Sequence, residues 1–153
     1  MNPDHLEGES VTEVARVRGF GEPLTAPPAY TESVPFHRDL SPLRRLVRTR
    51  AQAAGLAPHR VVDLVLAVGE ATANTVRHAG GAGTLRVWQD DTEIVCEVSD
   101  PGRMEDPGIG QLRPPAGTRG GQGLWIIQQA CDRVELHSSA AGTVVRMHMR
   151  RDA

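Results

Sequence analysis

The sequence contains no lysine, because all 17 of its basic residues are arginine. This absence excludes a Schiff-base lysine and a phosphate-loop lysine, and it leaves phosphate contacts to arginine or to backbone N–H groups. Positive charge is not in excess either, since the formal net charge is −2 and the sequence pI is about 6.3. Binding to nucleic acid or to an anionic membrane needs clustered positive charge, so we expect neither.

Cysteines and long apolar runs are also scarce. Cys96 and Cys131 lack metal-ligand spacing and lie among apolar residues, which predicts two reduced, buried thiols. No stretch approaches the ~20 apolar residues of a membrane span, and no apolar run follows a basic start. We therefore expect a soluble, cytoplasmic protein.

One domain is expected after an N-terminal tail. Residues 1–30 mix acidic residues with glycine and proline and lack an apolar period, which predicts a flexible tail. The remaining residues, 31–150, have the length of one domain. Strands are expected at 31–37, 84–89, 93–99, 134–138 and 143–149, and helices at 42–54, 58–79 and 122–131.

Helix and loop boundaries have recognisable signals. Ser41-Pro42 is typical of an N-cap followed by a first-turn proline, and Gly55 is expected to end that helix. Gly80-Gly81 is expected to end the next one. The segment 101–121 is rich in glycine and proline without periodicity, which is typical of a lid or a binding loop.

The helix expected at 58–79 has two different sides at 100° per residue. Seven mainly apolar residues predict its core face: Val61, Leu64, Val65, Val68, Thr72, Thr75 and Val76. A stripe opposite this face is formed by Asp63, Ala67, Glu70, Asn74 and Arg77.

Within the polar stripe, Glu70, Asn74 and His78 follow one another at four-residue spacing, with Arg77 beside them. A carboxylate, an amide and two basic groups can then face one ligand, although a solvated helix face has the same pattern. Apart from Asn2, Asn74 is the only asparagine, and it lies mid-helix, where asparagine is a poor helix former.

Two glycine-containing segments are further candidates. Asp100-Pro101-Gly102 is either an ordinary turn at a strand end or a site where the Asp accepts a hydrogen bond from an adenine amino group. The segment 120–124 is either a flexible linker or a helix start whose backbone N–H groups bind an anion.

In this order, the motifs resemble those of the Bergerat-fold, histidine-kinase-like ATPases. Glu70-x-x-x-Asn74 with Arg77-His78 is similar to the N box, Asp100-x-Gly102 to the first glycine box, and Gly121-x-Gly123-Leu124 to the second. Thr143, after Gly142, is similar to the final threonine position of the fold. The resemblance covers 31–150 and implies a two-layer α/β sandwich, in which helices pack on one face of a mixed, mainly antiparallel sheet.

The resemblance also implies roles for these residues around ATP and Mg²⁺. Glu70 is expected to be the general base, and Asn74 to hold Mg²⁺. The other expected nucleotide-binding residues are Arg77, His78, Asp100, Gly102, Gly121, Gly123, Leu124 and Thr143. The loop 103–120 is expected to close as a lid over the nucleotide.

Within the family, the segments around Glu70 and Gly123 are most similar to bacterial anti-sigma factor serine/threonine kinases. This similarity implies a sigma factor and an anti-anti-sigma factor as partners, and a homodimer. Two alternatives stay open: a nucleotide-binding regulatory module with little phosphotransfer, and a detached histidine-kinase catalytic domain. The first glycine box departs from the pattern, because Met104 stands where a second glycine is usual, which favours binding over turnover.

Overall fold

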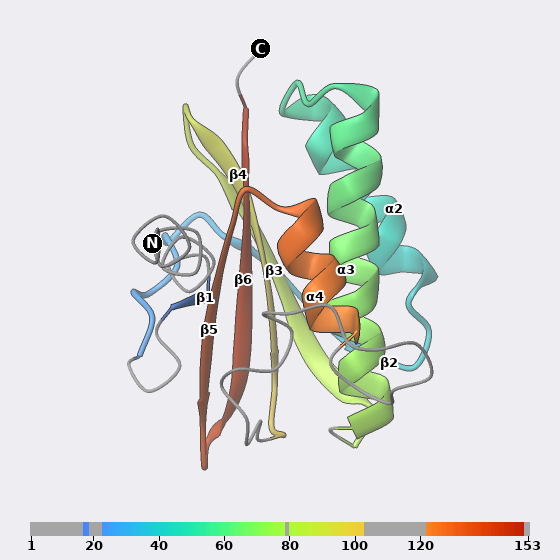
Figure 1. The fold of residues 1–153 in the computed structure, drawn as a ribbon, viewed down its shortest axis with the longest axis vertical. Helices are drawn as coiled ribbons and strands as arrows, with labels where there is room; N and C mark the ends of the chain where they lie inside the picture. The colour runs from blue at the N-terminus through green and yellow to red at the C-terminus, as the bar shows by residue number, and fades with distance from the viewer. Residues whose placement is uncertain (1–16, 19–22, 79, 103–121, 152–153) are drawn as a thin grey trace, which may run out of the picture.

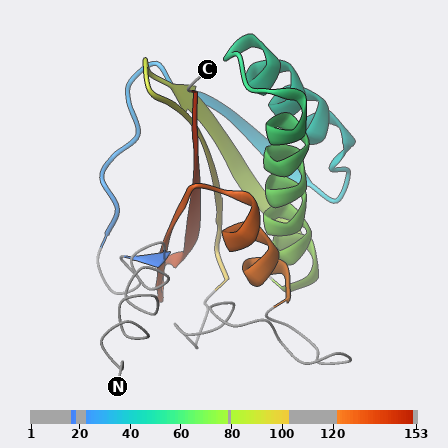
Figure 2. The same cartoon turned by 45° about the horizontal axis from the view of Figure 1, so that its top comes forward.

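A computed structural model describes residues 17–18, 23–78, 80–102 and 122–151 of the chain. The elements in these ranges are β1 (Val17–Arg18), β2 (Glu32–His37), α2 (Ser41–Ala53), α3 (Pro58–His78), β3 (Ala82–Gln89), β4 (Glu93–Asp100), α4 (Gln122–Ala130), β5 (Arg133–Ser139) and β6 (Gly142–Arg150). Figures 1 and 2 show a single sheet with these helices on one of its faces. This is the predicted two-layer α/β sandwich.

The sheet has the strand order β1-β5-β6-β4-β3-β2. Strand β1 pairs with β5 in parallel, and all other neighbours are antiparallel, so the sheet is mixed and mainly antiparallel as predicted. The last strand, β6, lies between β4 and β5. Because of this position, Asp100 at the end of β4 pairs with Thr143 at the start of β6.

The helix boundaries follow the predicted stop signals more closely than the predicted start. Gly55 and Gly80, which follow α2 and α3, have φ of +88° and +80°, a conformation that glycine adopts without strain. The predicted N-cap at Ser41 is wrong, since Ser41 is already helical and the N-cap residue is Leu40. The Asp39 carboxylate, two residues earlier, accepts the Ser41 N–H at 3.2 Å and so satisfies this donor at the start of the helix.

Helix α3 buries the side that its sequence predicts. Six of the seven predicted core residues are buried, and Val76 is half-buried. Ala67, predicted in the opposite stripe, is fully buried at 0% exposure, so that assignment is wrong. The physical reason is that α4 packs against the side of α3 that carries Glu70 and Asn74, which the periodicity of a single helix cannot reveal.

Part of the predicted tail contacts the sheet on the face without helices. The Arg146 guanidinium donates to the Thr25 carbonyl at 2.6 Å and to its hydroxyl at 3.1 Å. The Tyr30 hydroxyl donates to the Gln89 carbonyl at 3.0 Å. These contacts attach the stretch from Thr25 to Tyr30 to the sheet, while the domain boundary at residue 30 stays a prediction.

Both cysteines are free and buried, as their apolar surroundings predict. Burial raises the pKa of the Cys96 thiol above its usual range, and the nearby Cys131 raises it further. Among the described residues, no helix is long and apolar enough to cross a membrane.

Candidate functional site

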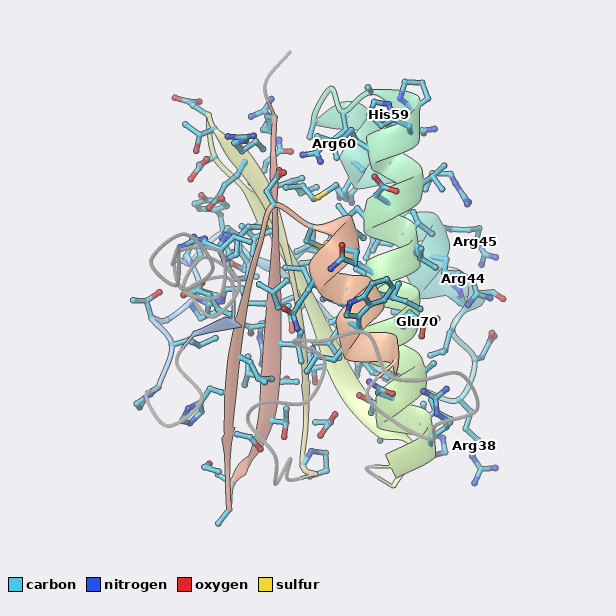
Figure 3. The ribbon with its side chains drawn as sticks, in the orientation of Figure 1. Arg38, Arg44, Arg45, His59, Arg60 and Glu70 are labelled. Atoms are coloured by element: carbon cyan, nitrogen blue, oxygen red, sulfur yellow. The ribbon has the colours of Figure 1, made fainter. Side chains whose placement is uncertain are left out.

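Parts of four elements meet at one end of the sandwich: the second half of α3, the end of β4, the start of α4 and the start of β6. Glu70 and Asn74 lie one turn apart on α3, and Figure 3 shows Glu70 beside α4. A Cβ at Gly123 of α4 would lie 3.2 Å from Glu70 Oε1 and 3.4 Å from Asn74 Nδ2. The glycine therefore lets the start of α4 approach both polar groups.

The last two residues of α3, Arg77 and His78, are both basic. The Arg77 guanidinium donates to Asn74 Oδ1 at 2.6 Å, so the two predicted site residues are in direct contact. His78 is the last residue of α3, and its side chain lies outside the described part of the chain.

The Asp100 carboxylate receives two hydrogen bonds. Oδ2 accepts the Thr75 hydroxyl at 2.7 Å, and Oδ1 accepts the Gly102 N–H at 2.8 Å. An ionised carboxylate has about four lone-pair positions, so positions remain for a ligand donor. Asp100 is half-buried and can therefore reach such a ligand.

Thr143 and Gly142 hold the segment after Asp100 in place. The Thr143 hydroxyl donates to the Gly102 carbonyl at 2.8 Å and is 2.8 Å from the Ser138 hydroxyl. Gly142 has φ of +138°, and a Cβ there would lie 2.3 Å from the Asp100 carbonyl oxygen. The backbone of β4 can approach this turn only because residue 142 is glycine.

Two residues of this network, Thr75 and Ser138, were not predicted from the sequence as site residues. Thr75 appeared only as part of the core face of α3, although a polar residue on an apolar face is a signal that could have revealed it. Ser138 could be found only from the pairing of β5 with β6, which brings it opposite Thr143.

The start of α4 supplies backbone donors rather than side chains. Leu124 is buried at 3% exposure, so its side chain belongs to the core and only its N–H group can face a ligand. The first N–H groups of a helix are free and carry partial positive charge, which suits a phosphate. Gly121, the predicted lid 103–120 and Met104 lie outside the described residues.

A metal ion at this site would depend on few protein ligands. No group of three or more His, Cys, Asp or Glu residues in the described ranges could hold a metal. Mg²⁺ in nucleotide sites usually keeps several waters and binds one or two protein oxygens together with phosphate oxygens. A single amide oxygen, such as Asn74 Oδ1, fits that chemistry.

The comparisons with known proteins agree with this geometry. Residues 37–149 match the model of a family described as the histidine kinase-like ATPase domain, and this match spans most of the chain. The chain therefore belongs to the histidine kinase-like ATPase family. No curated protein matches the chain. Family membership confirms the fold class and supports ATP as the nucleotide ligand.

Proposed function

We propose that this chain is an ATP-dependent serine/threonine protein kinase that acts as an anti-sigma factor and phosphorylates an anti-anti-sigma antagonist. The observation that carries the proposal is the approach of Gly123 to the Glu70 carboxylate and the Asn74 amide. A general base and a metal-holding oxygen then face the helix end that suits phosphates. The similarity of the sequence around these residues to anti-sigma kinases supports the finer assignment.

The residues at this end of the molecule fit a nucleotide with Mg²⁺. Asp100 keeps free lone-pair positions that suit the 6-amino group of adenine, and Thr143 supports the turn beside it. The N–H groups of Gly123 and Leu124 open α4 and suit phosphate oxygens. Asn74 offers one amide oxygen for Mg²⁺, and Arg77 adds positive charge next to it.

Phosphoryl transfer would use these residues mainly for positioning and for charge stabilisation. ATP, when bound, supplies the γ-phosphoryl group. Glu70 would accept the proton of the attacking serine hydroxyl. The serine oxygen would bond to the γ-phosphorus while the bond between this phosphorus and the ADP oxygen breaks. Arg77 would offset the negative charge of the phosphates, and the resemblance assigns His78 the same task.

The surface of α2 supports binding of an acidic partner protein. This helix contains four arginines and no carboxylate, in a chain whose formal net charge is −2. Only Arg50 has a described carboxylate partner, Glu32, at 2.8 Å. Figure 3 shows Arg44 and Arg45 on the outer side of the helical layer. An antagonist or sigma factor with an acidic surface would complement this charge.

Helix α3 also has exposed apolar side chains that a partner could contact. Val62 and Leu66 of α3 are 64% and 46% exposed and lie one helical turn apart. We propose that partner binding covers them. A homodimer, a cytoplasmic location and the absence of direct nucleic-acid or membrane binding remain parts of this proposal.

A nucleotide-binding regulatory module with little phosphotransfer is a second candidate. The observation that favours it is the 2.6 Å hydrogen bond from Arg77 to Asn74 Oδ1, because this donor already occupies one of the two lone pairs of the oxygen that would bind Mg²⁺. Met104 in the first glycine box points in the same direction. The two candidates differ only in whether phosphate is transferred.

The decisive experiment is incubation of the purified chain with labelled ATP and candidate antagonist proteins. Transfer to a serine or threonine is expected, and it should slow by roughly 10²–10⁴-fold in Glu70→Gln, as is typical for loss of a positioned base. ADP affinity, measured by calorimetry, should stay nearly unchanged in this variant. Asp63→Asn, on the same helix, is the matched control and should transfer normally.

Other variants separate the remaining roles. Asp100→Asn should lose more ADP affinity than Glu70→Gln, and Asn74→Ala should weaken nucleotide binding only when Mg²⁺ is present. ADP binding without any transfer would favour the regulatory module. Transfer to a histidine would instead identify a detached histidine-kinase catalytic domain, and absence of nucleotide binding would overturn all three assignments.

A further inference from the structure

Two buried threonines of α3 use their hydroxyl groups in different ways. Thr72 is 1% exposed and donates to the Val68 carbonyl at 2.8 Å, the usual bond of a helical threonine to the preceding turn. Thr75 is 0% exposed, but its hydroxyl is 3.4 Å from the equivalent Ala71 carbonyl. Its short contact, 2.7 Å, is with Asp100 Oδ2 on β4. Because a hydroxyl has one proton, Thr75 donates to the carboxylate.

This bond completes a two-sided support of Asp100. Gly102 N–H donates to Oδ1, while Thr75 donates to Oδ2, so each carboxylate oxygen has one fixed donor. Hydrogen bonds to an ionised carboxylate are stronger than neutral ones. Together, the two donors fix the orientation of the carboxylate plane. The remaining lone pairs of the two oxygens are left to accept a hydrogen bond from a ligand.

We propose that Thr75 is a positioning residue that determines base selectivity by holding Asp100 as an oriented acceptor for a 6-aminopurine. The inference rests on the proposed nucleotide site, in which Asp100 faces the base. A 6-oxopurine presents an oxygen where adenine presents an amino group, and two acceptors facing each other are unfavourable. A carboxylate held in a fixed orientation therefore rejects the oxo base, whereas one free to turn rejects it less.

The position of Thr75 in the chain gives it a second consequence. It follows Asn74 directly, so it points about 100° away from Asn74 around the helix axis. Asn74 lies toward Gly123 and Thr75 toward Asp100. One turn of α3 thus joins the predicted phosphate end of the site to its base end.

The test compares the binding of ADP and inosine diphosphate by calorimetry. The unmodified chain should prefer ADP. Thr75→Val keeps the shape of the side chain and removes the hydroxyl, so ADP should bind roughly tenfold more weakly while inosine diphosphate changes little. The ADP preference should then fall by about the same factor. Thr75→Ser retains the hydroxyl and should restore the preference.

Thr72→Val is the matched control, because Thr72 is equally buried on the same helix but does not contact Asp100. It should leave the ADP preference unchanged. A purely structural role of Thr75 would instead weaken both nucleotides equally and leave their ratio intact, which would overturn the inference. In an Asp100→Asn background, Thr75→Val should have no further effect on the ratio if Thr75 acts through Asp100.

The remaining outcomes of the experiment each decide for or against the inference. If Thr75→Val does not fold, Thr75→Ala removes the hydroxyl without adding bulk, and an unchanged nucleotide ratio in that variant would also overturn the inference. If the unmodified chain binds neither nucleotide, the proposed nucleotide site itself fails, and the inference fails with it. If the unmodified chain prefers ADP, and the preference is lost in variants lacking the Thr75 hydroxyl but kept in Thr72→Val, the inference stands.

Discussion

The two faces of the sheet are built in different ways. Toward the helices, the strands present aliphatic and sulfur-containing side chains, and Leu85, Ile94 and Met147 among them are 0% exposed. The helix-free face has a set of charged side chains. Among the described residues, the attached stretch that includes Thr25 contacts this set through Arg146. On the helix side, large apolar groups exclude water. On the helix-free side, the buried groups are polar and therefore need hydrogen-bond or ion-pair partners.

The charged groups of the helix-free face form a row across four strands. The register sets Arg86 opposite Glu97, Glu97 opposite Arg146, and Arg146 opposite Glu135, so the charges alternate in sign. The Arg146–Glu97 pair is the most buried, with a 2.7 Å separation and 5% exposure of each side chain. A one-residue slip would turn the apolar side chains to the other face of the sheet. A two-residue slip, which keeps them buried, would move Glu97 away from Arg146. We infer that the apolar face supplies most of the stability and the charged row selects the register.

The largest effect is expected on the apolar side. Leu64→Ala removes a fully buried side chain of α3 and should lower the free energy of unfolding by about 4 kcal/mol, because transfer and cavity terms add. Urea denaturation measures the loss. Leu66→Ala, on the exposed side of the same helix, should change the stability by less than about 1 kcal/mol. Equal losses would contradict the assignment of stability to the buried face.

A substitution in the charged row should lower the free energy of unfolding by less than Leu64→Ala. Glu97→Gln leaves the Arg146 guanidinium without its carboxylate, but the amide oxygen can still accept a hydrogen bond, so we expect a loss of about 2 kcal/mol. As a control, Glu97→Leu with Arg146→Met removes both charges, and this double variant should be at least as stable as Glu97→Gln. A double variant much less stable than the single one would mean that the row contributes stability rather than register.

The ion pair that joins the two layers predicts a pH dependence. Burial raises the pKa of Asp132, but the hydrogen bonds from Arg60 on α3 and from the Arg150 N–H on β6 outweigh it and hold this pKa below its usual range. A lowered folded-state pKa contributes stability above pH ~4, and this contribution is lost as the pH falls through the folded-state value.

Unfolding monitored between pH ~6 and ~2 tests this sign. The unmodified chain should lose more stability on acidification than Asp132→Asn, by an amount smaller than the effect of Glu97→Gln. Asp91→Asn, in the exposed turn between β3 and β4, serves as the control and should follow the unmodified chain. A pH profile of Asp132→Asn identical to that of the unmodified chain would contradict the stabilising role of this ion pair.

The smallest effect is expected at the N-terminal contact. Thr25→Ala removes the hydroxyl that accepts from Arg146 but keeps the carbonyl that accepts at 2.6 Å, so the stability should fall by only about 0.5–1 kcal/mol. Denaturation of this variant, beside Thr31→Ala, measures the difference. A loss as large as that of Leu64→Ala would mean that the segment is a full layer of the core.

Local patterns predicted most elements because their causes are local. The apolar period of α3 and its glycine stop are properties of neighbouring residues, and so is the turn at Asp90, whose carboxylate accepts the Thr92 and Glu93 N–H groups. The errors have local causes: the helix begins one residue earlier than expected, so Ser41 lies inside it and donates its own N–H to the Asp39 carboxylate. Ala67 was assigned to the wrong side because a small residue can face either water or another helix.

The sequence by itself determined the helices and the strand pairs that adjoin along the chain, and its resemblance to the family singled out Glu70, Asn74 and Asp100 as candidate site residues. Only the tertiary structure decided that β6 lies between β4 and β5, and this position brings Thr143 beside Asp100. It also decided that Thr75 donates to Asp100 rather than to its own helix. The physical reason is that periodicity reports which side of an element is buried, whereas the partner of a buried polar group depends on segments distant in the chain.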